Sequence, residues 1–179
     1  STKPSSILQP IDAYGISKMA AGKLGLLEAK KKKMSFIWVR IFSVYGKYEN
    51  PNSMIQVTLQ KLLKNENCDF STGTQMWDYL YSSDAGRAFL KLGDSETKNN
   101  YYCLGSGNAK PLKEYIYEMQ NILHSNSKLN FGIIQDNPIN RNGMCADITT
   151  LTQDTGWVPE VDFIQGIKWE VERLRRKMK

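Results

Sequence analysis

The feature that most constrains the fold is residues 36–42 (FIWVRIF), where every side chain except one arginine is apolar. A strand with one face in solvent alternates apolar and polar residues, whereas this run is apolar on both faces. It is therefore typical of a strand in a parallel sheet that helices cover on both sides. A chain that contains such a strand is expected to alternate strands with helices.

The rest of the chain has that alternation. Residues 13–33 have helical spacing and follow Asp12, a residue type favoured at helix N-caps. Other elements are predicted from their periodicity: helices at 53–64, 83–92, 112–123, 147–155 and 163–177, and short strands at 69–71, 77–81, 101–104 and 129–134. The sequence therefore predicts an α/β fold.

The composition of the chain argues against several classes of function. The chain has 24 Lys and Arg against 18 Asp and Glu, and its densest basic run, residues 30–33, falls where cations complement the dipole of the first helix. No nucleic-acid-binding motif accompanies that run, so we expect no nucleic-acid partner. No apolar run reaches the roughly 20 residues that span a bilayer, so no membrane segment is expected. Three scattered cysteines and one histidine argue against a metal site and fit reduced thiols in a cytoplasmic protein.

The motif with the clearest chemical meaning is the pair Tyr14 and Lys18. Side chains four residues apart on a helix lie on one face. A nearby ammonium group favours the phenolate form of tyrosine, which then exchanges a proton with a hydroxyl or carbonyl group as a general acid/base. The same spacing also arises when a tyrosine simply packs at the start of a helix, so the pair alone leaves both interpretations open.

Further segments in a fixed order give this pair a context. They are YGISK at 14–18, RIFSVYG at 40–46, WDYLYSSD at 77–84 and TGWVP at 155–159. This order and spacing resemble the motifs of the extended short-chain dehydrogenase/reductase superfamily. The chain is similar to the C-terminal portion of that superfamily's NAD-dependent epimerase/dehydratase (nucleotide-sugar epimerase) family, and the resemblance covers essentially all 179 residues.

The resemblance implies a fold and a reaction. Residues 1–52 would be the end of a Rossmann-type doubly wound parallel sheet, and residues 53–179 a small α/β domain for the substrate that can return one strand to that sheet. NAD or NADP is the implied cofactor, and a nucleoside-diphosphate sugar the implied substrate. The implied reaction is hydride transfer at a sugar carbon, the step that epimerases, dehydratases and ketoreductases share.

A homodimer is also implied. In the family, the helix that carries the tyrosine and lysine pairs with its counterpart in a second subunit. The corresponding helix here has a smooth side of small residues that would permit close packing: Ala20, Ala21, Gly22 and Gly25.

The resemblance assigns roles to individual residues. Tyr14 is the expected acid/base, and Lys18 favours its phenolate and holds the nicotinamide ribose. The nicotinamide pocket is expected to be lined by Phe42, Ser43 and Val44.

The contacts to the substrate are expected from Ser43, Lys47, Trp77 and Arg141. Two of these have open alternatives, because Trp77 suits a core position equally well and Arg141 lies in a loop where an arginine is often a plain surface charge. Three of the four also depart from the family: Ser43 replaces an asparagine, Lys47 a proline and Trp77 an arginine. An aromatic ring cannot pair with a phosphate as arginine does, so the identity of the substrate stays open.

The glycine-rich cofactor motif of the family is absent, because the sequence contains no GxxGxxG. We therefore expect this chain by itself neither to bind the cofactor stably nor to turn over substrate. Two other functions are considered: a non-catalytic module or subunit that binds a nucleotide sugar, and a basic nucleic-acid-binding domain. The intact YGISK motif favours the enzyme over the binding module. The 18 acidic residues, which offset most of the 24 basic ones, and the lack of a stripe of aromatic and basic residues argue against the nucleic-acid-binding domain.

Overall fold

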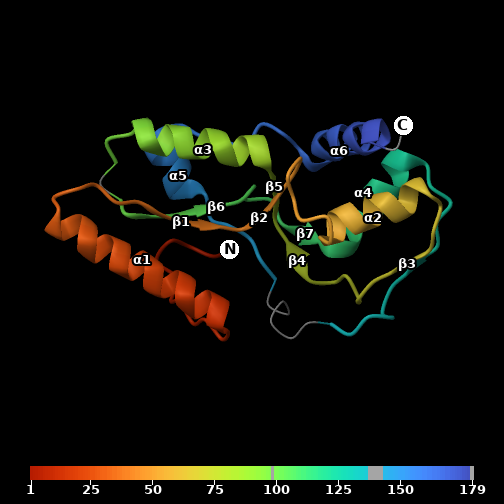
Figure 1. Ribbon diagram of the computed structural model, residues 1–179, viewed down its shortest axis with the longest axis horizontal. Coiled ribbons are helices and arrows are strands. Elements are labelled where there is room, and N and C mark those ends of the chain that lie inside the picture. Colours follow the sequence, from red (N-terminus) through yellow and green to blue (C-terminus); the bar gives the residue numbers. More distant parts are fainter. Residues whose placement is uncertain (98, 137–142, 178–179) are drawn as a thin grey trace.

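A computed structural model describes residues 1–97, 99–136 and 143–177 of the chain. Its longest helix, α1 (Ala13–Lys31), lies on one side of a parallel pair of strands, β1 (Trp38–Ile41) and β6 (Tyr101–Leu104), and α3 (Ser82–Asp94) lies on the other (Figure 1). The predicted α/β class with parallel strands under helices is thus confirmed.

The strand predicted at 36–42 changes partner as it proceeds. β1 pairs with β6, and β2 (Ser43–Tyr45) then pairs in parallel with β5 (Tyr79–Tyr81). At the changeover, the amide of Phe42 still donates to the carbonyl of Leu104, at 2.9 Å. One extended segment therefore connects the region around α1 to the rest of the molecule.

The remaining strands are short and form two further pairs. β3 (Cys68–Asp69) pairs in parallel with β8 (Leu129–Asn130), and β4 (Met76–Trp77) pairs antiparallel with β7 (Lys110–Pro111). The helices not yet named are α2 (Met54–Leu63), α4 (Leu112–Leu123), α5 (Thr149–Thr155) and α6 (Phe163–Lys177).

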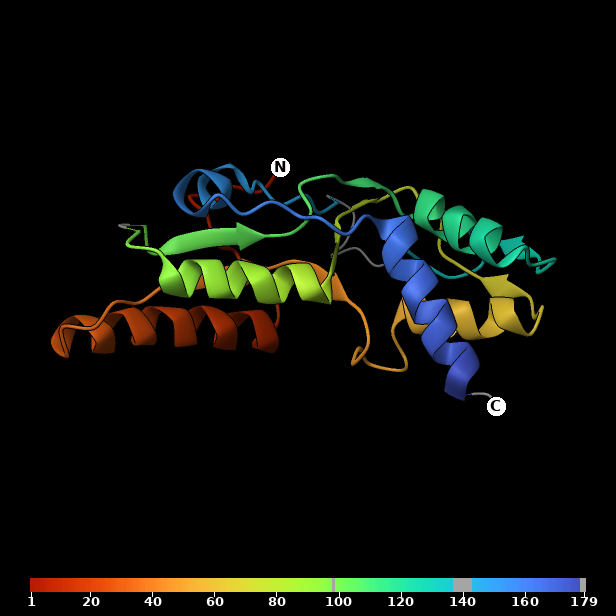
Figure 2. The same cartoon turned by 90° about the horizontal axis from the view of Figure 1, so that it is seen from above.

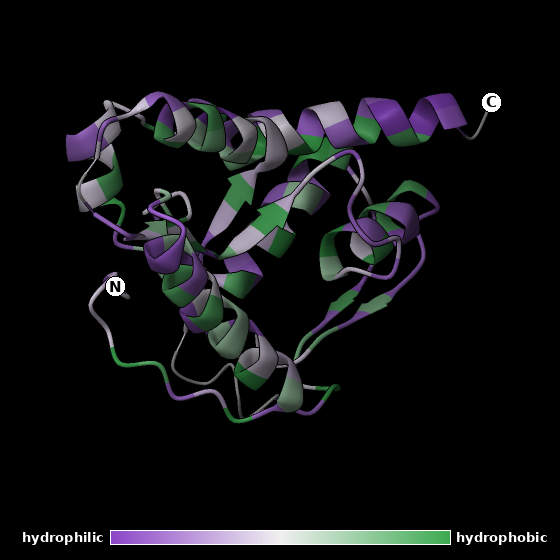
Figure 3. Cartoon of the chain, turned by 60° about the vertical axis from the view of Figure 1, so that its left-hand side comes forward, coloured by the Kyte–Doolittle hydropathy of each residue, from purple (hydrophilic) through white to green (hydrophobic). Residues whose placement is uncertain are grey.

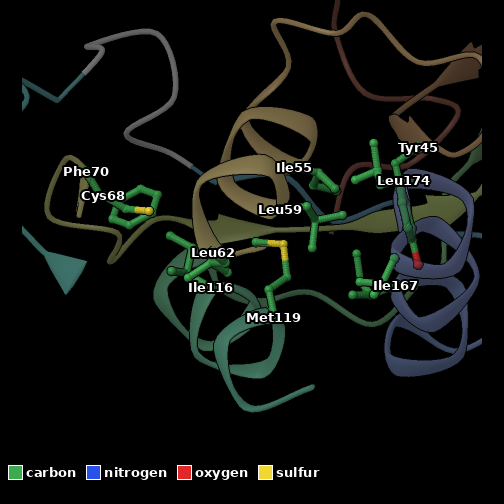
Figure 4. Close-up of a cluster of buried hydrophobic side chains, with 11 residues drawn as sticks. Tyr45, Ile55, Leu59, Leu62, Cys68, Phe70, Ile116, Met119, Ile167 and Leu174 are labelled. Atoms are coloured by element: carbon green, nitrogen blue, oxygen red, sulfur yellow. The ribbon is translucent and has the colours of Figure 1, made fainter. Parts of the chain in front are cut away.

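Two hydrophobic clusters hold the chain together. The larger lies between α2, α4 and α6 (Figure 4) and buries residues from all three helices, including Leu59, Ile116 and Ile167. The smaller lies under α3 and α5 and includes Leu104 from β6 and Trp157. Seen from above, α1 lies apart from the group α2, α4 and α6 (Figure 2).

Several predicted boundaries agree closely with the structure, and two are wrong. The predicted strand 77–81 is interrupted at Asp78, because the buried carboxylate of that residue bonds to segments outside the sheet. The predicted strand 129–134 ends at Asn130, where the chain turns and the amides of Ile133 and Ile134 both donate to the carbonyl of Phe70. The division of the chain at residue 52 stays a prediction, although β6 returns beside β1.

Part of the smooth side of α1 is occupied by side chains of the chain itself. A Cβ atom on Gly22 would lie 2.4 Å from the indole of Trp38, and one on Gly25 would lie 2.6 Å from the ring of Phe36. These glycines therefore admit the chain's own aromatic side chains, whereas Ala20 and Ala21 are exposed. Among the described residues, no helix is long and apolar enough to cross a membrane.

Candidate functional site

Tyr14 and Lys18 lie together in the first turns of α1. The carboxylate of Asp12 caps the helix by accepting a hydrogen bond from the amide of Gly15 at 2.6 Å, which fixes the start of the helix just before the tyrosine. The Lys18 ammonium nitrogen is 5.4 Å from the centre of the Tyr14 ring. Both side chains are exposed, Tyr14 to 71%, so a ligand can reach the phenol.

Residue 15, directly after the tyrosine, is glycine for a steric reason. A Cβ atom on Gly15 would lie 2.9 Å from the Cβ of Pro10 and 3.1 Å from the capping oxygen of Asp12. Glycine thus lets the preceding loop fold over the first turn of the helix while the cap stays in place. The motif YG after a proline-containing loop therefore specifies how the loop meets the helix.

Arg40 fixes the loop before Tyr14 through hydrogen bonds to the backbone of that loop. From β1, its guanidinium donates to the carbonyls of Lys3 at 3.3 Å, Pro4 at 2.9 Å and Ser6 at 3.0 Å. The sheet therefore determines the path of the loop that leads to Tyr14. Sequence reasoning identified Arg40 only as part of a motif, because its partners are backbone atoms more than 30 residues away.

The exposure of Tyr14 contrasts with most other tyrosines. Burial raises the pKa of the phenols of Tyr45, Tyr79, Tyr81 and Tyr102, and burial together with the charge of Asp78 raises the pKa of Tyr115 to about 12. These phenols stay protonated near neutral pH. Tyr48 is a second exposed tyrosine beside a lysine, with the Lys47 nitrogen 5.0 Å from its ring centre, but it lies on a turn after Gly46.

The predicted nicotinamide-pocket residues lie where β1 gives way to β2. Phe42, Ser43 and Val44 are all half-buried, and Val44 packs against the smaller core cluster. The β2–β5 register places Ser43 opposite Tyr79, two residues after Trp77. The structure thus brings Ser43 into the same part of the molecule as Trp77.

Trp77 is half-buried on β4, next to Tyr79, with 6.3 Å between ring centres. Its backbone carbonyl accepts a hydrogen bond from the Tyr115 hydroxyl at 3.0 Å. Within the part of the chain that the structure describes, its indole N–H is buried without a hydrogen-bond partner. A donor of this kind costs free energy unless an acceptor reaches it, so the ring is both a packing element and an unused donor.

A groove of about 410 Å³ lies between α2 and the segment that follows β3. Its apolar lining includes Val57, Phe70 and Leu112, and its polar lining includes Thr58 and Gln75. The carbonyl of Gln75 accepts from the amide of Leu112 at 3.0 Å, so the groove borders the strand that continues to Trp77. Its size falls within the range of ligand-binding clefts.

Lys47 lies in a different place from Ser43 and Trp77. It lines a second groove, of about 370 Å³, beside Trp169, Arg173 and Arg176 of α6. Figure 3 shows α6 becoming hydrophilic toward its C-terminal end, where these arginines lie. Arg141, the last predicted substrate residue, lies outside the described residues.

The three cysteines are free thiols, as expected, with Cys68 and Cys103 buried. The residues that the structure describes contain no cluster of three or more His, Cys, Asp or Glu that could hold a metal ion.

Comparisons with known proteins relate the chain to one family. The model of the NAD dependent epimerase/dehydratase family matches residues 1–105. CDP-abequose synthase from Salmonella typhimurium is 27% identical over 172 residues, which cover 93% of this chain and 57% of that protein.

Two solved structures share the fold. UDP-glucose 4-epimerase from Thermotoga maritima, determined with UDP-glucose, has a TM-score of 0.87 at 22% identity and covers 96% of this chain and 56% of its own. RMD from Pseudomonas aeruginosa, complexed with NADPH, has a TM-score of 0.88 at 18% identity and covers 97% and 59%. The chain thus spans a little over half the length of the proteins that it matches.

Proposed function

The chain belongs to the NAD-dependent epimerase/dehydratase family, and from this membership we propose that it carries the acid/base and the substrate-binding part of an enzyme that transfers hydride at a carbon of a nucleotide-linked sugar. In this proposal a further cofactor-binding region supplies the glycine-rich turn that the sequence lacks. Epimerase, dehydratase and ketoreductase activities all remain compatible with the site.

The observation that carries the proposal is the accessible Tyr14 phenol with the Lys18 ammonium one turn away. With the Lys18 ammonium beside its ring, Tyr14 would take the proton of a sugar hydroxyl when the carbon is oxidised and return it when a keto group is reduced. The buried phenols of Tyr45 and Tyr79 cannot do so near neutral pH, because burial raises their pKa.

The residues fit one end of a nicotinamide cofactor. Lys18 and Tyr14 are exposed on one helix face and can hold the ribose next to the nicotinamide, and the half-buried Phe42 and Val44 offer an apolar wall for the ring. The pyrophosphate has no glycine-rich turn to bind here. When bound, the nicotinamide would accept and return the hydride.

The substrate's nucleotide is proposed to bind in the groove between α2 and the segment after β3. A flat base fits against apolar side chains such as Phe70 and Leu112, and Lys61 at the lining supplies a cation for a phosphate. The groove borders Gln75, and the strand from Gln75 leads to Trp77, whose free indole N–H would donate to the substrate. Figure 1 shows the first turn of α1 as the end of that helix nearer to β4.

A homodimer through α1 is part of the proposal. The helix exposes Ala20, Ala21, Leu24 and Leu27, and a second copy packed on these residues would cover apolar surface that is otherwise in water. The molar mass of the enzyme in solution, measured by sedimentation equilibrium, tests this part: a monomer would contradict it.

The test of the function is turnover. The full-length polypeptide, with its cofactor-binding region, is mixed with NAD or NADP and with UDP-, dTDP-, CDP- and GDP-linked sugars, and the sugar products are identified by mass spectrometry and NMR. We expect at least one nucleotide sugar to be epimerised, dehydrated or reduced. The 179-residue chain alone is expected to convert none of them.

Two results would contradict the proposal. Binding of a nucleotide sugar without any conversion would indicate a non-catalytic binding module or subunit, the second function considered from the sequence. Oxidation of NADH by the 179-residue chain alone with a 4-keto sugar nucleotide would show that no further cofactor-binding region is needed.

A further inference from the structure

Asp78, between β4 and β5, is a fully buried carboxylate with hydrogen bonds on both oxygens. Its Oδ1 accepts from the amide and the hydroxyl of Ser106, at 2.7 and 2.6 Å. Its Oδ2 accepts from the amides of Gly107 at 3.2 Å and Ala146 at 2.9 Å. A buried carboxylate is tolerated because all these partners donate to it.

The turn after β6 packs closely against the Asp78 carboxylate. A Cβ atom on Gly105 would lie 2.6 Å from Oδ2 of Asp78 and 2.7 Å from the Cβ of Ala146, so the turn after β6 can approach only because residue 105 is glycine. The sequence 105–107 (GSG) is thus a turn that wraps around a protein carboxylate.

Asp78 joins segments that serve different parts of the proposed site. The turn at 105–107 follows β6, which pairs with β1 in the sheet beneath α1. Residue 146 belongs to a segment that runs beside Met76, whose carbonyl accepts from the amide of Met144 at 2.8 Å. Trp77, whose indole N–H has no hydrogen-bond partner among the described residues, directly precedes Asp78.

The same segment also connects to the loop before Tyr14. The amide of Thr2 donates to the carbonyl of Cys145 at 2.7 Å, and the amide of Asp147 donates to the carbonyl of Thr2 at 2.9 Å. Arg40 fixes the next residues of that loop. A continuous set of hydrogen bonds therefore runs from the loop that leads to the acid/base to the strand that carries Trp77, and Asp78 is where it meets the sheet.

We propose that Asp78 is a positioning residue that holds the Trp77 strand and the segment 143–147 in register with the sheet that supports Tyr14, and so sets the distance between the substrate-binding and proton-transfer parts of the site. Its role in catalysis rests on the proposed function. Its role as the junction of these segments does not, and the two can be tested apart.

The variant is Asp78→Asn, and the matched control is Asp84→Asn. Asp84 is equally buried and accepts from the amides of Glu160 and Val161, both at 2.9 Å, but it ties α3 to the segment before α6. An asparagine at position 78 turns its NH₂ group either toward the amides of Gly107 and Ala146, which loses two hydrogen bonds, or toward Ser106, whose hydroxyl can rotate to accept while its amide loses its acceptor. At position 84, asparagine can keep both backbone bonds and loses the ion pair with Arg87.

The first readout needs no ligand. Amide hydrogen exchange is measured on wild type and both variants under conditions where all are folded. We expect exchange at residues 105–107 and 143–147 to rise at least about 10-fold in Asp78→Asn and to stay near wild type in Asp84→Asn. An equal rise in both variants, or none in Asp78→Asn, would overturn the role of Asp78 as the junction.

The second readout is steady-state kinetics of the full-length enzyme with the nucleotide sugar that the turnover screen identifies. A change that only lowers the folded fraction reduces the apparent kcat at constant KM. We expect Asp78→Asn to raise KM and lower kcat, each at least about 10-fold, and Asp84→Asn to leave KM unchanged. Unchanged KM in Asp78→Asn would overturn the catalytic part of the inference. Absence of turnover in wild type would instead contradict the proposed function and leave the exchange result to decide the rest.

Discussion

The two longest helices of the chain differ sharply in how they are anchored. In α1, which has 19 residues and carries the proposed acid/base, only Gly22 and Ala29 are buried. In α6, which has 15 residues, five are buried, among them Ile167 and Val171 in the larger core cluster. The helix with the proposed chemistry is therefore the less buried of the two.

The difference separates the region that stabilises the fold from the region that carries the proposed chemistry. The cluster between α2, α4 and α6 is a closed apolar core, which can hold a groove for a ligand in fixed shape. α1 keeps Tyr14, Lys18 and several apolar side chains, including Leu24 and Leu27, at the surface. In our proposal that surface is completed by the cofactor, the cofactor-binding region and a second subunit.

The largest expected effect separates the two regions by stability. Leu59→Ala, in the larger core cluster, should lower the free energy of unfolding by about 2–5 kcal/mol, because it leaves a cavity among well-packed neighbours. Leu24→Ala on α1, where the side chain is 61% exposed in the single chain, should change the free energy of unfolding of the monomer by less than about 0.5 kcal/mol. Urea denaturation of the 179-residue chain measures both, and equal losses would break the comparison.

A pair of glycines tests how α1 is packed. Alanine is intrinsically better than glycine in a helix, by about 1 kcal/mol. Gly86→Ala on α3, where a Cβ would meet nothing within 4 Å, should therefore raise the melting temperature by a few degrees. Gly22→Ala should lower it, because the new methyl group would press on Trp38. A stabilised Gly22→Ala variant would show that α1 does not rest against that indole.

A smaller effect is expected from the indole of Trp77, and it concerns the affinity for the substrate. Trp77→Phe removes a buried N–H that has no partner among the described residues, so the stability of the free protein should be unchanged or slightly higher. If that N–H donates to the substrate, calorimetry should show binding of the nucleotide sugar weakened by about 2–10-fold.

Trp157→Phe is the matched control for that variant. The Trp157 indole already donates to the carbonyl of Asp84, at 3.1 Å, so its removal should reduce stability and leave substrate affinity unchanged. Unchanged affinity in Trp77→Phe would show that the Trp77 indole serves packing only.

The smallest expected effect is the pH dependence of stability that comes from Glu49. Burial raises the pKa of Glu49, which favours its protonated form in the folded state. The stability that this provides is fully present below the ordinary glutamate pKa, near 4.3, and is lost as the pH rises through the raised value. Glu49→Gln should therefore gain stability relative to wild type as the pH increases from 4 to 7, by an amount worth a few degrees in melting temperature. A pH-independent difference between the two proteins would contradict this.

The sequence predicted best the elements whose pattern is local. The amphipathic helices at 112–123 and 163–177 and the strand at 101–104 agree with α4, α6 and β6, because their periodicity is set by one buried face. It failed at Asp78, where WDYLY has the composition of one strand. The partners that break that strand, Ser106 and Ala146, lie 28 and 68 residues away and are bonded largely through backbone atoms.

The candidate site shows the same limit. Spacing alone predicted that Tyr14 and Lys18 share a face, and the structure places them so. Two features of the site were not predictable: the hydrogen bonds of Arg40 to the loop before Tyr14, and an indole N–H of Trp77 without a partner among the described residues. Each depends on what the folded chain brings near it. Lys47 was grouped with the substrate residues by its place in a motif, yet it lies beside α6.

The central claim, that Tyr14 moves the proton in a nucleotide-sugar redox reaction, is tested most directly by single-turnover hydride transfer in the full-length enzyme, followed by nicotinamide absorbance. Tyr14→Phe is compared with Tyr48→Phe, which removes the other exposed phenol beside a lysine. We predict that Tyr14→Phe slows the transfer by about 10²–10⁴-fold without weakening substrate binding, and that Tyr48→Phe does neither. Transfer at the wild-type rate in Tyr14→Phe would contradict the account.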